Sequence, residues 1–309
     1  MKTQLIIHPE ELNKKWIDRL ADNNVDVLGI HPHGGGESHD SLIELLEMAE
    51  SKEYRKLIDY AISKGIQVEY EIHCANYLMP REYFDKNPEY FRTNKKGALT
   101  PDYNFCSSND SAMNIVCENA VKLVSKLYGS TSNYYLWMDD ERDIFCHCDK
   151  CSQYSASDQQ MIILNKILKA ISTYDKNAHL AYLAYHSTLI PPMSVKPDKN
   201  IFLEYAPIGR DISKGASQMP DDEVENINNL ISFFGNKNAK CLEYWLDNSF
   251  FTRLAGKLTK LIPDNEMIKN DFKFYSDLGF EYISSFACLM GDEYESLYGE
   301  PDISSFNLL

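Results

Sequence analysis

Three adjacent carboxylates follow an apolar run near the middle of the chain. Asp139, Asp140 and Glu141 come directly after residues 134–138, which have the composition of a short buried strand. Because like charges repel at this spacing, the pKa of at least one of these carboxyls should rise. A protonated carboxyl beside an ionised one is the pair that hydrolyses a glycosidic bond. We therefore interpret the three residues as candidate catalytic groups; the alternative is a solvated loop that caps the next helix.

A second set of polar and aromatic side chains recurs where other apolar runs end. Carboxylates near a buried strand are costly unless paired, so Glu204 and Glu243 could bind sugar hydroxyls, supply a second catalytic carboxylate, or form salt bridges with arginines. Tyr244 or Trp245 could stack on the apolar face of a sugar ring. The residues that we expect to line a substrate site are His31, His33, Glu71, His73, Tyr185, His186, Glu204, Tyr205, Glu243, Tyr244, Trp245 and Asp247.

The elements that must position these residues alternate between strand-like and helix-like segments. A continuous helix is predicted over residues 41–64 and closed by Gly65, and another over 158–174 with Ser157 as its cap. About eight such alternations favour an α/β fold, a (β/α)8 TIM barrel. Residues 1–309 are read as one domain, with a long inserted loop at about 74–133 after the third strand. The predicted strands are residues 4–8, 25–31, 66–73, 134–138, 179–185, 201–205, 239–245 and 280–287.

Three cysteines in one short segment are spaced as metal ligands. Cys146, Cys148 and Cys151 can wrap a tetrahedral zinc ion when a fourth ligand arrives from elsewhere. Cys106 is the expected fourth ligand, with His147 in reserve, because the loops after the third and fourth strands of a barrel are neighbours. The alternatives are separate reduced thiols, or a disulfide of Cys106 in an exported protein. We predict a structural zinc and no cofactor for catalysis.

Histidines at strand ends suggest a rival chemistry. His31 and His33, with His73 and His186, are typical of metal-dependent amidohydrolases, which gather histidines at a barrel mouth. That class also needs a lysine after the fourth strand and an aspartate after the last one. This sequence has no lysine directly after residues 134–138, and its last predicted strand ends in Phe-Ala-Cys. We therefore keep the metal-dependent amidohydrolase as the alternative to a glycosidase.

Composition limits the classes of partner. The chain has 309 residues, a net charge of −15 and 44% hydrophobic residues, as expected of a globular protein that can bury a large core. A strongly acidic surface repels nucleic acid and anionic lipid, so we expect neither as a partner. The first apolar run is broken by Pro9 and Glu10, too soon for a signal peptide, so we predict a cytoplasmic location; the alternative is a domain of a longer chain. The sequence does not indicate an oligomeric state.

Several strings taken together resemble the DUF4838 family, which overlaps glycoside hydrolase family 163. The resemblance covers residues 25–298, and its most specific part is the acidic pair followed by the cysteines. It implies a barrel glycosidase, with endo-β-N-acetylglucosaminidase activity known in part of the group and members often exported. The strings are Pro88-Glu89-Tyr90-Phe91, Asn104-Phe105-Cys106-Ser107-Ser108, Trp137-Met138-Asp139-Asp140, Ser157-Asp158-Gln159 and Leu203-Glu204-Tyr205-Ala206-Pro207-Ile208.

The prediction from the sequence is a retaining glycoside hydrolase that cleaves a glycan containing N-acetylhexosamine with substrate assistance. The Asp139–Asp140 pair also resembles that of family 84 hexosaminidases, which implies that Asp139 orients the acetamido group and Asp140 is the acid/base. Glu141 is the substitute if the register differs by one residue. The expected partner is a carbohydrate. The alternatives are a hydrolase that binds its metal through His31 and His33, and a barrel that binds glycans without cleaving them.

Overall fold

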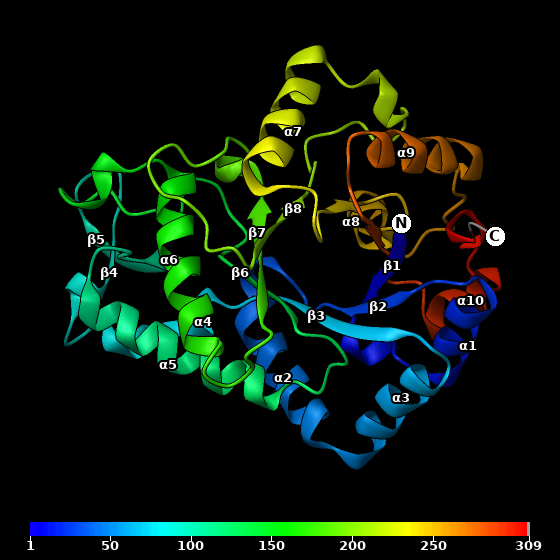
Figure 1. Cartoon of the computed structure of the whole chain (residues 1–309). Coiled ribbons are helices and arrows are strands. Elements are labelled where there is room, and N and C mark those ends of the chain that lie inside the picture. Colours follow the sequence, from blue (N-terminus) through cyan, green and yellow to red (C-terminus); the bar gives the residue numbers. More distant parts are fainter. Residues whose placement is uncertain (308–309) are drawn as a thin grey trace.

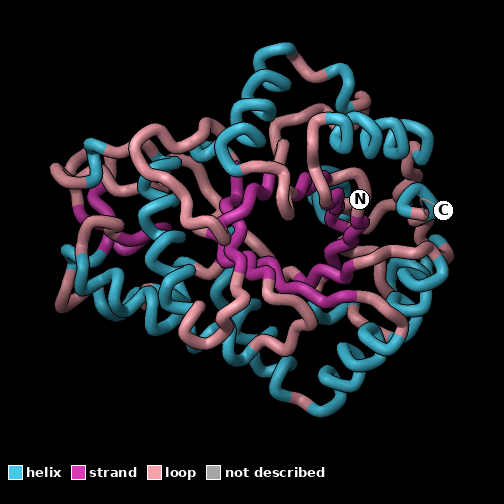
Figure 2. Tube along the Cα trace, in the orientation of Figure 1, coloured by secondary structure: helices cyan, strands magenta, loops and turns pink. Residues whose placement is uncertain are grey.

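The computed structural model describes residues 1–307 and contains a closed barrel of parallel strands. The strands follow one another around the barrel as β1-β10-β9-β8-β7-β6-β3-β2, and Figure 2 shows them as a ring enclosed by helices. The predicted (β/α)8 TIM barrel is confirmed. The barrel strands are β1 (Lys2–Ile7), β2 (Val27–Ile30), β3 (Gln67–His73), β6 (Asn133–Trp137), β7 (His179–Ala184), β8 (Ile201–Tyr205), β9 (Lys240–Glu243) and β10 (Tyr282–Phe286).

Helices surround this ring on its outward side (Figure 1). Side chains alternate along a strand, so one set packs against the helices and the other fills the barrel. In β1, for example, Leu5 and Ile7 join the outer core, whereas Ile6 belongs to the inner cluster. The helices are α1 (Lys14–Asp22), α2 (Ser38–Glu50), α3 (Lys52–Ser63), α4 (Ala75–Leu78), α5 (Asp110–Lys126), α6 (Ala156–Ile171), α7 (Asp221–Phe234), α8 (Asn248–Ala255), α9 (Asn265–Asp277) and α10 (Asp292–Tyr298).

The long segment between β3 and β6 has secondary structure of its own. It contains α4, an antiparallel pair formed by β4 (Phe91–Thr93) and β5 (Leu99–Phe105), and then α5. The β4–β5 pair lies to one side of the barrel, beyond α6 in the view of Figure 1. α5 packs against α6, which ties the segment to the barrel wall. The segment is therefore a structured platform beside the loop that follows β6.

Two details of the helices differ from the sequence prediction. The helix predicted over residues 41–64 is two helices, because Ser51 is extended and its side chain caps α3 by accepting a hydrogen bond from the Tyr54 amide at 3.2 Å. Gly65 does end this region, with a φ of +85°. α6 is capped by Ser155 rather than Ser157, since Ser155 and Asp158 form a reciprocal capping box.

A buried ionic network fills part of the barrel interior. Lys240 is fully buried, and its Nζ lies 2.6 Å from an oxygen of Glu71 and 2.9 Å from an oxygen of Glu204. Gln4 donates to Glu71 at 2.6 Å, and the Trp137 indole donates to Glu204 at 2.7 Å. Burial raises the pKa of Glu71, and the ammonium of Lys240 opposes that rise. These charges are paired inside the barrel, as buried charges must be.

None of the helices within residues 1–307 combines the length and the apolarity needed to span a bilayer.

Candidate active site

A cavity of about 530 Å³ opens at the end of the barrel where the strands terminate. Residues at or beyond the end of every barrel strand contribute to its wall, which is the side where TIM barrels hold their active sites. Its volume is within the roughly 300–1,000 Å³ of small-molecule pockets. The lining residues include His8, His31, His33, Gly34, Glu37, His73, Trp137, Asp140, Glu141, Leu183, Tyr185, His186, Ala206, Leu242, Tyr244, Asp247, Arg253, Phe286 and Cys288.

The three carboxylates after β6 point in different directions. Asp140 lines the cavity, and its Oδ1 accepts a hydrogen bond of 2.8 Å from the Tyr185 hydroxyl. Asp139 turns toward Arg81, with 3.2 Å between Oδ2 and Nη2, and is not among the lining residues. Burial raises the pKa of Asp139, opposed by the charge of Arg81. Glu141 is exposed at the cavity rim.

Gly34 allows close approach to Asp140. A Cβ atom at this glycine would lie 3.2 Å from Oδ2 of Asp140 and 3.8 Å from Nε2 of His31. Any larger residue at this position would crowd the carboxylate. The lack of a side chain at Gly34 thus leaves the Oδ2 edge of Asp140 accessible.

Asp247 is a second aspartate in the cavity wall, and it comes from a segment far from Asp140 in the sequence. It lies beyond β9 and caps α8, with Oδ1 accepting from the Ser249 amide at 3.0 Å. Burial raises the pKa of Asp247, and the hydrogen bonds from Ser249 oppose the rise. Asp140 and Asp247 are therefore the two aspartates that line the cavity.

Main-chain carbonyls hold the rings of His31 and His73 in the cavity wall. The Nδ1 atoms of His31 and His73 lie 2.7 and 2.6 Å from the carbonyl oxygens of Glu71 and Met138. A carbonyl only accepts, so Nδ1 carries the hydrogen in each ring. Burial lowers the pKa of His31 well below its usual value, which keeps that ring neutral with Nε2 as an acceptor.

His33 is engaged differently, which bears on the amidohydrolase alternative. Its Nε2 lies 2.8 Å from Oε1 of Glu10, and its ring stacks on His8 with 3.9 Å between centroids. Within residues 1–307, the side-chain ligand atoms of three or more His, Cys, Asp or Glu residues converge only at a cysteine cluster. His31 and His33 do not belong to such a group.

The floor of the cavity is apolar. Trp137, Leu242 and Phe286 belong to the inner barrel cluster and also line the cavity. The Tyr244 ring lies 5.5 Å from the Phe286 ring, and His31 packs 5.3 Å from Trp137. Apolar surface beside carboxylates suits a ligand with both apolar faces and polar edges, as a sugar ring has.

His186 has a strained backbone beside this site. Its φ is +47°, a region that non-glycine residues rarely adopt. Its ring packs on Tyr185 with 3.9 Å between centroids, and both side chains line the cavity. The strained turn thus presents the tyrosine that donates to Asp140.

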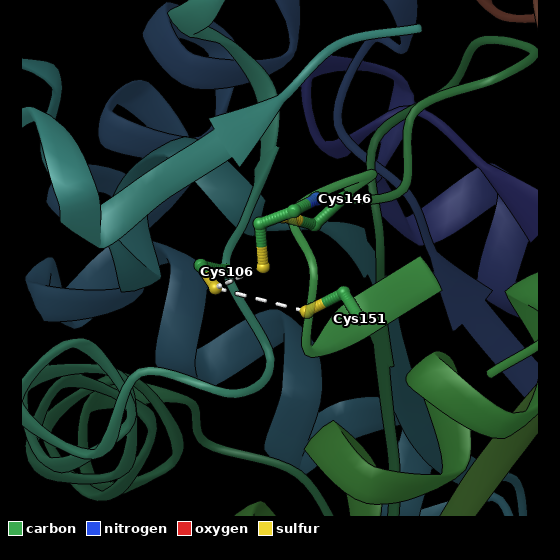
Figure 3. Close-up of side chains that lie close together, drawn as sticks. Cys106, Cys146 and Cys151 are labelled. Atoms are coloured by element: carbon green, nitrogen blue, oxygen red, sulfur yellow. Dashed lines mark hydrogen bonds between the residues drawn. The ribbon is translucent and has the colours of Figure 1, made fainter. Parts of the chain in front are cut away.

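Some predicted site residues lie elsewhere. Glu71 and Glu204 pair with Lys240 inside the barrel. Three others face the helices: Glu243 pairs with Arg210 at 2.8 Å, Tyr205 donates to Glu223 at 3.0 Å, and Trp245 donates to Asp271 at 3.2 Å. The structure does bring Cys106, Cys146, Cys148 and Cys151 together beside the loop after β6 (Figure 3).

Comparison of the whole sequence with known families decides the classification. The model of DUF4838, described as a domain of unknown function, matches residues 46–293. The chain belongs to the DUF4838 family. The resemblance to this family is thus confirmed, whereas the relation to glycoside hydrolase family 163 stays a prediction. No curated protein matches the sequence.

Solved structures share the fold of this DUF4838 protein at low sequence identity. A β-galactosidase from the psychrophilic Marinomonas ef1 superposes with a TM-score of 0.56 and 11% identity, over 92% of this chain and 54% of the galactosidase. The chain thus spans about half the length of that enzyme. A structure described as a glycoside hydrolase has a TM-score of 0.50 and 11% identity, over 93% of this chain and 88% of its own. Both likenesses concern the barrel fold.

Several residues that line the cavity of this DUF4838 protein are not among those predicted from the sequence. His8 directly follows β1, so the rule that polar residues after a barrel strand reach the mouth would have found it. Leu242 and Phe286 are apolar residues within strands, and nothing in their local sequence separates a cavity floor from ordinary core.

Proposed function

We propose that this DUF4838 protein is a glycoside hydrolase that cleaves a glycan containing N-acetylhexosamine, with Asp140 as the general acid/base. The observation that carries the proposal is the position of Asp140. Its carboxylate lies on the wall of a cavity of about 530 Å³, held by Tyr185 on one oxygen and left uncrowded by Gly34 on the other. Carboxylates at this end of a barrel are typical of hydrolytic sites.

The substrate would lie across the apolar floor. One face of the sugar ring would contact Trp137 and Phe286, and its hydroxyls would meet the neutral His31 imidazole and Tyr244. The apolar floor also offers a place for the methyl group of an acetamido substituent. The glycosidic oxygen would then lie beside Asp140.

In the first step, protonated Asp140 gives its proton to the glycosidic oxygen as the bond to C1 breaks. The acetamido oxygen of the same sugar attacks C1 and forms an oxazolinium ion. In the second step, ionised Asp140 takes a proton from water, and the water oxygen replaces the acetamido oxygen at C1. The two inversions give net retention and return Asp140 to its protonated form.

A second carboxylate is needed to accept the acetamido N–H and to stabilise the positive charge of the intermediate. Asp139 faces Arg81, so we assign this role to Asp247, which lines the cavity from the loop after β9. This revises the role expected for Asp139 from the sequence. Asp139 would instead hold the loop, because its amide donates to Asn104 at 3.1 Å and its carboxylate pairs with Arg81.

The test is a substrate panel with matched leaving groups. Aryl N-acetyl-β-glucosaminide and N-acetyl-β-galactosaminide are compared with aryl β-glucoside and β-galactoside, together with chitooligosaccharides and N-glycans, and products are read by mass spectrometry. We expect turnover of acetamido substrates, inhibition by a thiazoline that mimics the oxazolinium ion, and a large loss of turnover in Asp247→Asn. Equal turnover of the sugars without acetamido groups would contradict the substrate class. Saturable binding without any product would contradict hydrolysis and indicate a glycan-binding barrel.

A further inference from the structure

We propose that Cys106, Cys146, Cys148 and Cys151 bind one zinc ion, and that this ion fastens the loop carrying Asp140 to the platform formed by β4 and β5. The four cysteines come from two segments that are far apart in sequence. Cys106 directly follows β5, and the other three lie between β6 and α6.

The sulfur positions match a tetrahedral site. The Sγ atom of Cys106 lies 3.8 Å from that of Cys148 and 3.7 Å from that of Cys151, and all four Sγ atoms lie within 4.8 Å of one another. Zinc–thiolate bonds of about 2.3 Å in a tetrahedron place the sulfurs about 3.8 Å apart. Figure 3 shows the side chains of Cys106, Cys146 and Cys151 turned toward one another.

The surroundings of the sulfurs suit thiolates bound to a cation. The amides of Thr93 and Cys148 donate to Sγ of Cys146 at 3.3 and 3.5 Å. The hydroxyl oxygen of Ser108 lies 3.1 Å from Sγ of Cys151, where it can donate to a thiolate. Donors of this kind orient metal ligands and offset their negative charge. Four cysteine ligands leave no open position, so the site is structural and not catalytic.

The cluster is linked to the carboxylate loop by short connections. Asn104, which accepts a hydrogen bond from the Asp139 amide at 3.1 Å, is two residues from Cys106. The His147 amide donates to the carbonyl of Thr93 at 2.7 Å, which fixes the middle of the loop to β4. The side-chain amide of Gln159 in α6 accepts a hydrogen bond from the Cys146 amide at 3.1 Å and donates one to the Cys146 carbonyl at 3.0 Å. The metal would add a further link between the loop and the β4–β5 platform, at the end of the loop that is distant from Asp140.

The metal itself is tested without any substrate. Protein purified without added zinc is analysed for metal by mass spectrometry, and the zinc is then exchanged for cobalt. We expect about one zinc per chain and the absorption bands of tetrahedral cobalt with thiolate ligands. Cys148 is the most exposed of the four ligands. Removing a residue that only hydrogen-bonds a metal ligand lowers metal affinity ~10–100-fold, and Cys148→Ser, which removes a ligand itself, should lower zinc affinity by more than this. Cys117→Ser, a half-buried cysteine outside the cluster, is the matched control and should keep full affinity.

Several results would overturn the zinc site. They are purified protein without metal, bound iron in place of zinc, a cobalt spectrum that is not tetrahedral, or a mass lower by two hydrogens that shows a disulfide among the four cysteines. An unfolded Cys148→Ser protein would not decide the question. In that case, protection of four thiols from a thiol reagent in folded wild-type protein, and their release by a strong chelator, gives the answer.

The fastening of the loop is tested separately, and its link to catalysis rests on the proposed role of Asp140. Amide hydrogen exchange is compared between the zinc-loaded and the chelated protein. In the chelated protein, we expect faster exchange of the amides in residues 138–155 than in the zinc-loaded protein. Exchange in β1, β7 and β8 should be the same in both. Unchanged exchange in residues 138–155 would overturn the fastening while leaving the metal site intact. If exchange changes but glycosides are never cleaved, the metal inference stands and the proposed function fails.

Discussion

Carboxylates occupy two levels of this barrel, and their surroundings differ. In the interior, Glu71 and Glu204 are fully buried and both contact Lys240, at 2.6 and 2.9 Å. At the mouth, Asp140 is partly exposed, accepts a hydrogen bond from Tyr185 and lines the cavity. The interior carboxylates share one buried cation, Lys240, whereas Asp140 faces the cavity.

The position of each carboxylate relative to its strand explains this difference. Glu71 and Glu204 lie within β3 and β8, so their side chains either fill the barrel or face the helices. Asp140 and Asp247 lie beyond the last residues of β6 and β9, in loops that rise to the mouth. The carboxylates inside these two strands thus serve the fold, whereas Asp140 and Asp247 in the following loops line the cavity.

The largest effect on stability should come from Lys240. Replacing it by Met leaves Glu71 and Glu204 buried without a cation, and we expect the free energy of unfolding to fall by about 3–5 kcal/mol. Urea unfolding at neutral pH measures this change. Adding Glu71→Gln to the same protein should recover part of the loss, because one buried charge is removed. A loss below about 1 kcal/mol in the single variant would mean that the interior carboxylates are not held by this lysine.

A smaller effect, on activity alone, should come from Tyr185. Removing its hydroxyl in Tyr185→Phe deletes the hydrogen bond that would stabilise Asp140 once it has given up its proton, a bond to a charged group worth about 1.5–3 kcal/mol. We expect turnover to fall roughly tenfold to a hundredfold, with little change in the midpoint of unfolding. Tyr128→Phe is the matched control, because Tyr128 donates to Asp59 at 2.9 Å on the surface. Equal turnover of the two variants would show that Tyr185 does not support the acid/base.

The smallest effect concerns the stacked histidines at the rim. The hydrogen bond to Glu10 raises the pKa of His33, whereas burial lowers the pKa of His8. The stability that His33 adds is therefore fully present below pH ~6.5 and lost as the pH rises through its folded pKa. NMR titration should show the two rings shifted in opposite directions, and Glu10→Gln should return the His33 pKa toward its ordinary value. A His33 titration that Glu10→Gln leaves unchanged would exclude the proposed pairing.

The sequence predicted the fold well because the barrel depends on repeated local patterns. Apolar runs separated by helical periodicity located the barrel strands to within two residues at each end. The break at Ser51 was missed because the apolar pattern continues on both sides, through Leu46 and Ile58. The N-cap of α6 was placed at Ser157 and not at Ser155, because both serines precede acidic or polar residues in the same run.

The site was predicted less completely, because side-chain direction depends on distant partners. Neighbouring loops of a barrel meet, which is why Cys106 was expected beside the later cysteines. The opposite directions of Asp139 and Asp140 depend on Arg81 and Tyr185, each far away in sequence. No local pattern around residues 139–140 contains that information.

The role of Asp140 as the acid/base is tested by comparing Asp140→Asn with Asp143→Asn. Asp143 lies on the same loop, is exposed, pairs with Lys95 at 2.7 Å, and has a φ of +53° that asparagine tolerates. With an acetamido substrate found in the panel, we expect Asp140→Asn to lose about 10²–10⁴ in kcat, while unfolding changes by less than about 0.5 kcal/mol. Asp143→Asn should retain turnover. Near wild-type turnover of folded Asp140→Asn would contradict the account.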